Sequence, residues 1–170
     1  MGQPQSVFLE EFKAAFHRQI DAGIIWSGGQ GKENTAGFAK PFGCRRNNGK
    51  LKAERFELGD LSAVYHGWKI IIEFENKEVP LSNLLKYWPY LRGELADQPD
   101  RNVLICHFSD WWSYATRRDL WEWTLARIKA DPGVLFAMEG RQFDHWGQDA
   151  DRRAASISDA IAWIDQTVRA

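Results

Sequence analysis

Apolar and polar residues alternate on both sides of one tight turn, and this pattern predicts a β-hairpin over residues 60–75. The turn is His66-Gly67, because glycine accepts the positive φ that a two-residue hairpin loop requires. When the pairing is counted back from this turn, Asp60 lies directly across from Glu73. The hairpin is therefore expected to bring two acidic side chains together.

The two faces of the predicted hairpin differ in polarity. One face is wholly apolar and is expected to pack on a core: Leu61, Ala63, Tyr65, Trp68, Ile70, Ile72 and Phe74. The other face carries Asp60, Glu73 and Glu75 at one end. Like charges on neighbouring strands repel, and a divalent cation such as Mg²⁺ removes that repulsion by binding carboxylate oxygens and water. The pattern predicts a metal site, and the alternative is a set of solvated acids at frayed strand ends.

Periodic apolar positions predict the elements around the hairpin. Apolar residues three or four positions apart predict helices over residues 6–21, 81–88 (with 92 as the alternative end), 110–131 (beginning at Asp110 or Ser113) and 156–168. Short apolar or alternating runs predict strands over residues 50–58, 102–109 and 134–138. Ser6 and Ser156 are the expected helix caps, and Pro89 is expected to bend or interrupt the second helix. This order predicts an α/β fold with a mixed sheet flanked by helices.

Length and composition favour a single soluble domain. A chain of 170 residues, 44% hydrophobic and 26% charged, suits one globular domain spanning residues 1–170. The 2 cysteines indicate neither a disulfide framework nor a cysteine-based metal site. Because the sequence lacks a long apolar stretch and the pattern of a signal peptide, no membrane partner is expected and the predicted location is cytoplasmic.

The net charge is −1, so any binding of nucleic acid has to come from a local basic patch. Such a patch lies in residues 40–55, where six basic residues accompany a single acid, Glu54. Its candidate phosphate contacts are Arg45, Arg46, Lys50 and Lys52. The alternative is a solvated loop and strand edge. Asn83 and Tyr87, on the polar side of the helix that follows the acids, are further candidates for contact with nucleic acid.

Other motifs carry less information. Gly31-Lys32 lacks the preceding glycine and the following Ser or Thr of a phosphate-binding loop, so that function is not expected. His107, in a buried apolar run, is expected to be a core residue with its hydrogen bonds satisfied. His145 beside Asp144 is a possible metal ligand.

The order of elements and the positions of the acids together resemble the PD-(D/E)XK nuclease superfamily, which has the restriction-endonuclease-like fold. Asp60 matches the family's Asp at the start of the second strand, and Glu73-Phe-Glu75 matches its Glu/Asp-x-Lys motif on the third. The resemblance covers roughly residues 6–109 and implies an αβββαβ core, to which the C-terminal helices and a strand are additions. Gly59 stands where the family often has proline.

The resemblance also implies roles for these residues. Asp60, Glu73 and Glu75 would hold Mg²⁺, for which Mn²⁺ can substitute, and Glu75 would orient or deprotonate the attacking water. Glu75 stands where the family usually has lysine. Lys86, on the following helix, is the expected substitute that stabilises negative charge in the transition state.

The implied function is metal-dependent cleavage of nucleic acid, with DNA as the expected substrate. Glu10 or Glu11 would correspond to the acidic residue that the family often places on its first helix, and a homodimer would allow two sites to cut both strands of a duplex. One alternative is an inactive module of the same fold that binds nucleic acid or a protein. Another is a metal-dependent hydrolase of a different phosphate ester.

Overall fold

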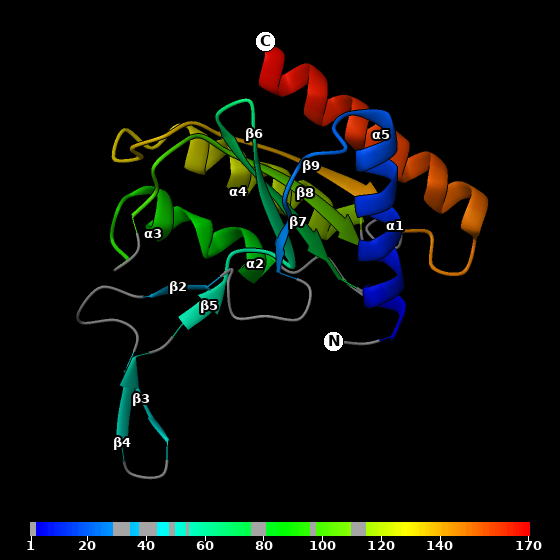
Figure 1. Ribbon diagram of the computed structural model, residues 1–170. Coiled ribbons are helices and arrows are strands. Elements are labelled where there is room, and N and C mark those ends of the chain that lie inside the picture. The colour runs from blue at the N-terminus through cyan, green and yellow to red at the C-terminus, as the bar shows by residue number, and fades with distance from the viewer. Residues whose placement is uncertain are drawn as a thin grey trace.

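The computed structural model describes residues 3–28, 35–37, 44–47, 50–53, 55–75, 81–95, 98–109 and 115–170. Its centre is a five-stranded sheet in the order β1-β6-β7-β8-β9 (Figure 1). The strands are β1 (Ser27–Gly28), β6 (Leu61–Tyr65), β7 (Trp68–Phe74), β8 (Val103–Ser109) and β9 (Met138–Asp144). The first three pair antiparallel and the last three parallel, so the sheet is mixed, as predicted.

The central hairpin has the predicted register. Tyr65 pairs with Trp68 at the turn, and the pairing continues to Leu61 and Ile72 at the other end. His66 and Gly67 have φ values of 46° and 78°, as a turn with two left-handed residues requires. The backbone N–H of Asp60 donates to the carbonyl of Ile72 at 2.9 Å, so the acid is tied to the opposite strand.

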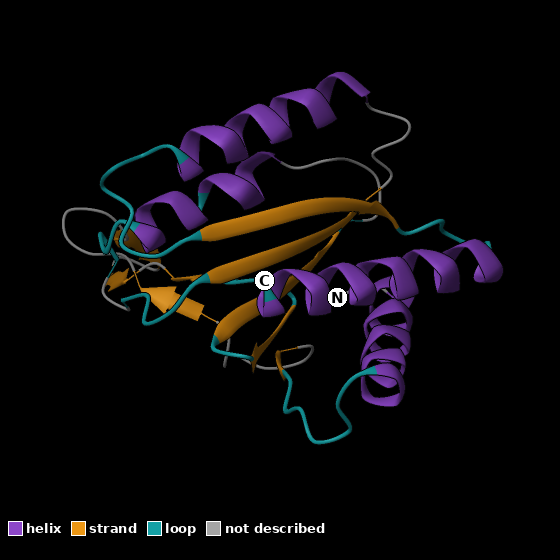
Figure 2. Ribbon diagram, turned by 90° about the horizontal axis from the view of Figure 1, so that it is seen from above, coloured by secondary structure: helices purple, strands orange, loops and turns teal. Residues whose placement is uncertain are grey.

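Helices cover both faces of the sheet (Figure 2). One face packs against α1 (Gln3–Gln19) and α5 (Ala150–Arg169). The other packs against α2 (Leu81–Leu85), α3 (Tyr87–Leu91) and α4 (Ala115–Lys129). The helix predicted from residue 81 is thus two short helices that meet at Lys86. The expected interruption at Pro89 is wrong, because Pro89 lies within α3. Among the described residues, no helix is both long and apolar enough to cross a membrane.

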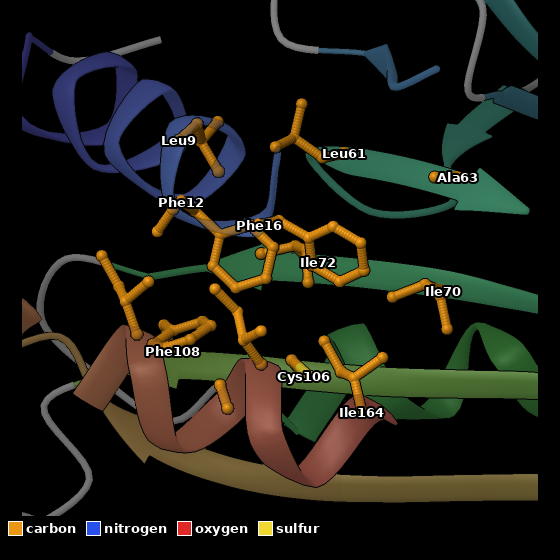
Figure 3. Close-up of a cluster of buried hydrophobic side chains, with 14 of the residues drawn as sticks. Leu9, Phe12, Phe16, Leu61, Ala63, Ile70, Ile72, Cys106, Phe108 and Ile164 are labelled. Atoms are coloured by element: carbon orange, nitrogen blue, oxygen red, sulfur yellow. The ribbon is translucent and has the colours of Figure 1, made fainter. Parts of the chain in front are cut away.

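The apolar face of the hairpin forms the larger core. Leu61, Ile70 and Ile72 lie against Phe12 and Phe16 of α1 (Figure 3). In this core, the ring of Phe8 from α1 contacts rings from two strands. Its centroid lies 4.8 Å from that of Phe74 and 4.6 Å from that of Phe108. Full burial of each large side chain contributes about 1.5–3 kcal/mol relative to exposure, so this face fixes the hairpin on the body of the protein.

The predicted strand over residues 50–58 is wrong as a member of the main sheet. Its residues form β4 (Lys50–Ala53) and β5 (Arg55–Glu57), which pair with β3 (Cys44–Asn47) and β2 (Thr35–Gly37) in two separate two-stranded sheets. Figure 1 shows the β3–β4 hairpin extending away from the main sheet. The neighbour of β6 is instead β1, whose two residues carry no apolar alternation that a sequence pattern could detect.

Two further predictions near the C-terminus and one at the N-terminus need correction. The strand expected at residues 134–138 is β9, which begins only at Met138 and occupies part of the predicted loop. Its residues facing α4 include Gly140 and Gln142, so its apolar alternation is weak. The last helix begins at Ala150, where Asp149 accepts a hydrogen bond from Arg152 N at 3.1 Å, and not at Ser156. The first helix begins at Gln3, ahead of Ser6.

Gly59, which precedes Asp60, is expected to be indispensable for stability. Its φ is +88°, and a Cβ there would lie 2.4 Å from Ile71 Cγ2 and 3.1 Å from the carbonyl oxygen of Ile72. Gly59→Ala should therefore lower the free energy of unfolding by about 2–4 kcal/mol, combining left-handed strain with overpacking. Gly67→Ala is the matched control, because its φ is +78° but nothing lies within 4 Å of the added Cβ.

Urea denaturation of the two variants measures the difference. Gly67→Ala should cost only the backbone term, about 1–2 kcal/mol. Equal losses in the two variants would contradict the close packing described around Gly59.

Candidate functional site

Polar side chains replace the apolar core at one end of the sheet, on the face covered by α2, α3 and α4. Ile71 of β7 is fully buried in the apolar core of this face. The next residues of β7 on the same side are Glu73, then Glu75 just after the strand, and Asp60 lies just before β6. The alternation that keeps one face of the hairpin apolar therefore gathers the three acids on the other, at the end where β7 and its parallel neighbours terminate.

Asp60 is oriented by two donors. Gln5 Nε2 of α1 donates to Oδ1 at 2.6 Å, and the backbone N–H of Phe74 donates to Oδ2 at 2.8 Å. Gln5 is a site residue that sequence analysis missed. An uncharged residue in the first turns of a helix gives no signal until the packing of that helix is known.

The two candidate accessory acids of α1 do not reach the site. Glu11 forms a two-pronged ion pair with Arg153 of α5, at 2.6 and 3.0 Å. Glu10 is exposed and pairs with Lys13 at 2.5 Å, one turn along the same helix. The residue of α1 that contacts Asp60 is instead Gln5.

Glu73 is the most deeply buried acid of the site, with 4% of its surface exposed. Lys86 Nζ lies 2.6 Å from its Oε1, and the hydroxyl of Tyr87 donates to the same oxygen. Burial raises the pKa of Glu73 to about 7, although Lys86 and Tyr87 favour the ionised form; the charge of Asp60 adds to the increase. Glu73 can therefore change its protonation state near neutral pH.

Lys86 and Tyr87 occupy the junction between α2 and α3. Lys86 lies beside the acids, where the sequence suggested that it would. Tyr87 is fully buried, and burial raises the pKa of its hydroxyl well above the usual value. The prediction that Tyr87 contacts nucleic acid is therefore corrected, since its ring is inside the protein and its hydroxyl holds Glu73.

Glu75 and Asn83 contact each other. Asn83 Nδ2 of α2 donates to Glu75 Oε1 at 2.5 Å, and the backbone N–H of Glu75 donates to the carbonyl of Phe108 at 2.8 Å. The short α2 helix thus supplies a neutral donor to one acid, while the residue that follows α2 supplies an ammonium group to another.

The polar end of this face continues across the parallel strands. The register pairs Glu73 with His107 of β8, and His107 with Gln142 of β9. His107, Ser109 and Gln142 are buried, and among the described residues nothing hydrogen-bonds to His107 Nε2, Ser109 Oγ or Gln142 Oε1. Buried polar atoms without partners are uncommon, so they mark a polar region built beside the acids.

His107 is buried as expected, but within the described part of the chain its Nε2 lacks the hydrogen-bond partner that the sequence predicts for it. Burial lowers its pKa to about 3, with the positive charge of Lys86 contributing, so the imidazole is neutral over the physiological range. His145, the other candidate ligand, accepts a hydrogen bond at Nδ1 from the backbone N–H of Gly147 at 2.9 Å. Its ring lies 4.9 Å from that of Phe74.

The three acids carry the oxygen ligands that Mg²⁺ prefers, but they do not form a preformed coordination site. Among the described residues, no three His, Cys, Asp or Glu side chains stand close enough to share an ion. Mg²⁺ usually takes one or two protein carboxylates and completes its coordination with water and substrate phosphate. Asp60 and Glu73 supply two carboxylates, and the charge of Asp60 contributes to the raised pKa of Glu73, so the two groups interact electrostatically.

The candidate phosphate contacts lie on the β3–β4 hairpin. Arg45 pairs with Lys52, Arg46 with Leu51, and Asn47 with Lys50 along its two strands. Four basic residues are therefore concentrated in one short two-stranded ribbon.

Comparisons with protein-family models, with curated proteins and with solved structures find no match to this chain.

The buried pair Glu73 and His107 predicts opposite pH dependences of stability. The pKa of Glu73 is raised from 4.5 to about 7 on folding, so its contribution to stability is present below pH 4.5 and is lost as the pH rises towards 7. The pKa of His107 is lowered from 6.5 to about 3, so its contribution is present above pH 6.5 and is lost as the pH falls towards 3.

Urea denaturation at intervals from pH 4.5 to 6.5 should separate the two contributions. Relative to wild type, Glu73→Gln should gain stability as the pH rises, and His107→Gln should lose it. Each slope is limited to about 1.4 kcal/mol per pH unit, the value for one titrating group. Stability curves that stay parallel to wild type in both variants would show that neither side chain has the assigned pKa.

Proposed function

We propose that this protein is a metal-dependent nuclease of the PD-(D/E)XK type, with a restriction-endonuclease-like core, that hydrolyses phosphodiester bonds of DNA. The observation that carries the proposal is the ion pair between Lys86 and the buried Glu73, beside Asp60, at the end of β7. Carboxylates can hold a metal ion that activates water, and an adjacent ammonium group can stabilise the charge that develops on a phosphate, so this arrangement suits metal-assisted phosphodiester hydrolysis.

The order of elements supports this assignment. The elements α1, β1, β6, β7, α2–α3 and β8 occur along the chain in the order of the αβββαβ core, with β1 in place of the predicted first strand and with the strands β2 to β5 inserted between β1 and β6. Asp60 then stands at the start of the second core strand, and Glu73 on the third. These are the positions of the family's acidic residues.

The carboxylates of Asp60 and Glu73 would hold Mg²⁺ or Mn²⁺, with Glu75 as a further oxygen donor. The bound ion would polarise the scissile phosphate and lower the pKa of an attacking water. An ion bound at Glu73 Oε1 would displace the ammonium group of Lys86. Lys86 would then stabilise the negative charge that develops on the phosphate.

The other residues of the site position these groups. Gln5 and the backbone of Phe74 hold Asp60, and Tyr87 holds Glu73. Glu75, which Asn83 orients, would accept a proton from water. The basic β3–β4 hairpin, which carries Arg45, Arg46, Lys50 and Lys52, would contribute contacts to the phosphates of the substrate.

A second candidate function is a binding module that keeps the fold but does not cut. The observation in its favour is that each acid already has a donor from the protein: Gln5 for Asp60, Lys86 for Glu73 and Asn83 for Glu75. Such a module would bind nucleic acid or a protein in the presence of EDTA and would leave DNA intact.

Cleavage of plasmid and oligonucleotide DNA in Mg²⁺ or Mn²⁺, with an EDTA control, tests the proposal. Asp60→Asn and Glu73→Gln should each lower the cleavage rate by at least about 10²-fold, and Lys86→Met should do so without weakening the binding of the metal. The matched control is the exposed pair Lys129–Glu139, which has the same 2.6 Å contact outside the site. Lys129→Met and Glu139→Gln should cleave as wild type does.

Cleavage by wild type that persists in Asp60→Asn and Glu73→Gln would overturn the assignment of the site. Absence of cleavage together with EDTA-insensitive binding would favour the second candidate.

A further inference from the structure

A cleft of about 600 Å³ lies where β9 ends and α5 begins. Its lining includes Arg141 and Phe143 of β9, Trp146 of the connecting turn and Arg152 of α5. Phe143 belongs to the core on the α1–α5 face of the sheet, whereas Glu73 lies on the opposite face. The cleft is therefore separate from the acidic site, and neither the sequence motif nor the proposed nuclease activity accounts for it.

The turn between β9 and α5 holds Trp146 in an unusual conformation. Trp146 has φ 56°, a left-handed value that costs a bulky residue of order 1–3 kcal/mol. The turn is tied by Asp149 N to the carbonyl of Trp146 at 2.9 Å and by Arg153 Nη1 to the carbonyl of Gly147 at 2.7 Å. Arg153 is itself anchored to Glu11 of α1. The backbone of this turn is thus held by hydrogen bonds and, through Arg153, by an ion pair, and Trp146 itself remains only partly buried.

Both arginines of the cleft lie over aromatic rings. The guanidinium carbon of Arg141 is 5.0 Å from the centroid of Phe143, and that of Arg152 is 4.9 Å from the ring of Trp146. A stacked guanidinium still directs its N–H groups outwards in its own plane, where they match the oxygens of a phosphate. Among the described residues no carboxylate pairs with Arg141, and the contact of Arg152 with Asp149 is long, at 3.4 Å.

The cleft also contains two acids, Asp144 and Asp159, so its formal charges balance. A bare anion gains little from a balanced cleft. A ligand that combines a phosphate with a flat ring bearing N–H donors can contact every kind of group in the cleft. The arginines bind its phosphate, the carboxylates accept from base amino groups, and the aromatic side chains stack on the base. Nucleotides have this combination of groups.

We propose that this cleft binds one nucleotide, with its base stacked against Trp146 and its phosphate on Arg141 and Arg152. The same chemistry is offered by a free mononucleotide and by an unpaired nucleotide within a single strand. The inference does not depend on cleavage, because it concerns residues outside the acidic site. Its test can therefore be made in EDTA, where a failure of the proposed nuclease function cannot affect the result.

The test is fluorescence anisotropy of a labelled single-stranded oligothymidylate in EDTA, with AMP as competitor. Trp146→Ala and Arg141→Gln should each weaken binding by about 5- to 100-fold, in line with the loss of one stacked base or one phosphate contact. The matched control is the stack of Arg127 on Trp123 of α4, with a similar 5.1 Å separation at a different surface. Trp123→Ala and Arg127→Gln should bind as wild type does.

The two sources of the ligand give different results. If AMP displaces the oligonucleotide from wild type but not from Arg141→Gln, the cleft is a mononucleotide site. If the oligonucleotide binds and AMP does not displace it, the cleft is a site for an unpaired strand. Both results support the proposal. Absence of binding by both probes, or equal binding in wild type and both cleft variants, would overturn it. Arg141 is exposed, so Arg141→Gln decides the matter even if Trp146→Ala does not fold.

Discussion

The candidate site depends on one physical constraint, the burial of the Glu73 carboxylate. A carboxylate taken out of water without partners costs several kcal/mol, so its position on β7 demands neighbouring donors. The chain supplies them from two consecutive residues, Lys86 and Tyr87, at the junction between α2 and α3. The break between these short helices is therefore best understood as the feature that aims both side chains at a single oxygen.

The sheet provides the setting for this arrangement. On the face covered by α2, α3 and α4, the parallel strands are apolar as far as Ile71 and Ile105, and polar from Glu73 and His107 onwards. The opposite face is apolar along the hairpin and packs on α1 and α5. The apolar packing on one face thus supports the strand ends, whose other face carries polar side chains that include atoms without hydrogen-bond partners among the described residues. His107 and its neighbours offer buried hydrogen-bonding capacity next to the acids.

Local signals predicted the centre of this site, and non-local packing decided the rest. The His66-Gly67 turn and the alternation around it are contained within one short segment, so the register that unites Asp60 with Glu73 could be deduced from the sequence. The two-residue strand β1 and the edge strand β9 are each defined by pairing with a neighbouring strand, β6 and β8 respectively. Neither has enough apolar alternation to be recognised alone.

Side-chain environments were predictable only where residues are close in sequence. Lys86 follows the acids closely enough for its proximity to be expected. The contact of Gln5 with Asp60 spans most of the N-terminal half of the chain, and the burial of Tyr87 depends on how α3 packs. For the same reason, the row from Glu73 through His107 to Gln142 became visible only once the order of the parallel strands was known.

We propose that Asp60 and Glu73 form a metal site from which Lys86 withdraws when the ion binds. Anomalous diffraction from a crystal soaked in Mn²⁺ would reveal the ion and the position of Lys86 together. We expect an anomalous peak between the carboxylates of Asp60 and Glu73, with Lys86 Nζ moved away from Glu73 Oε1. Crystals that take up no Mn²⁺ at this position and keep the Lys86–Glu73 ion pair intact would contradict it.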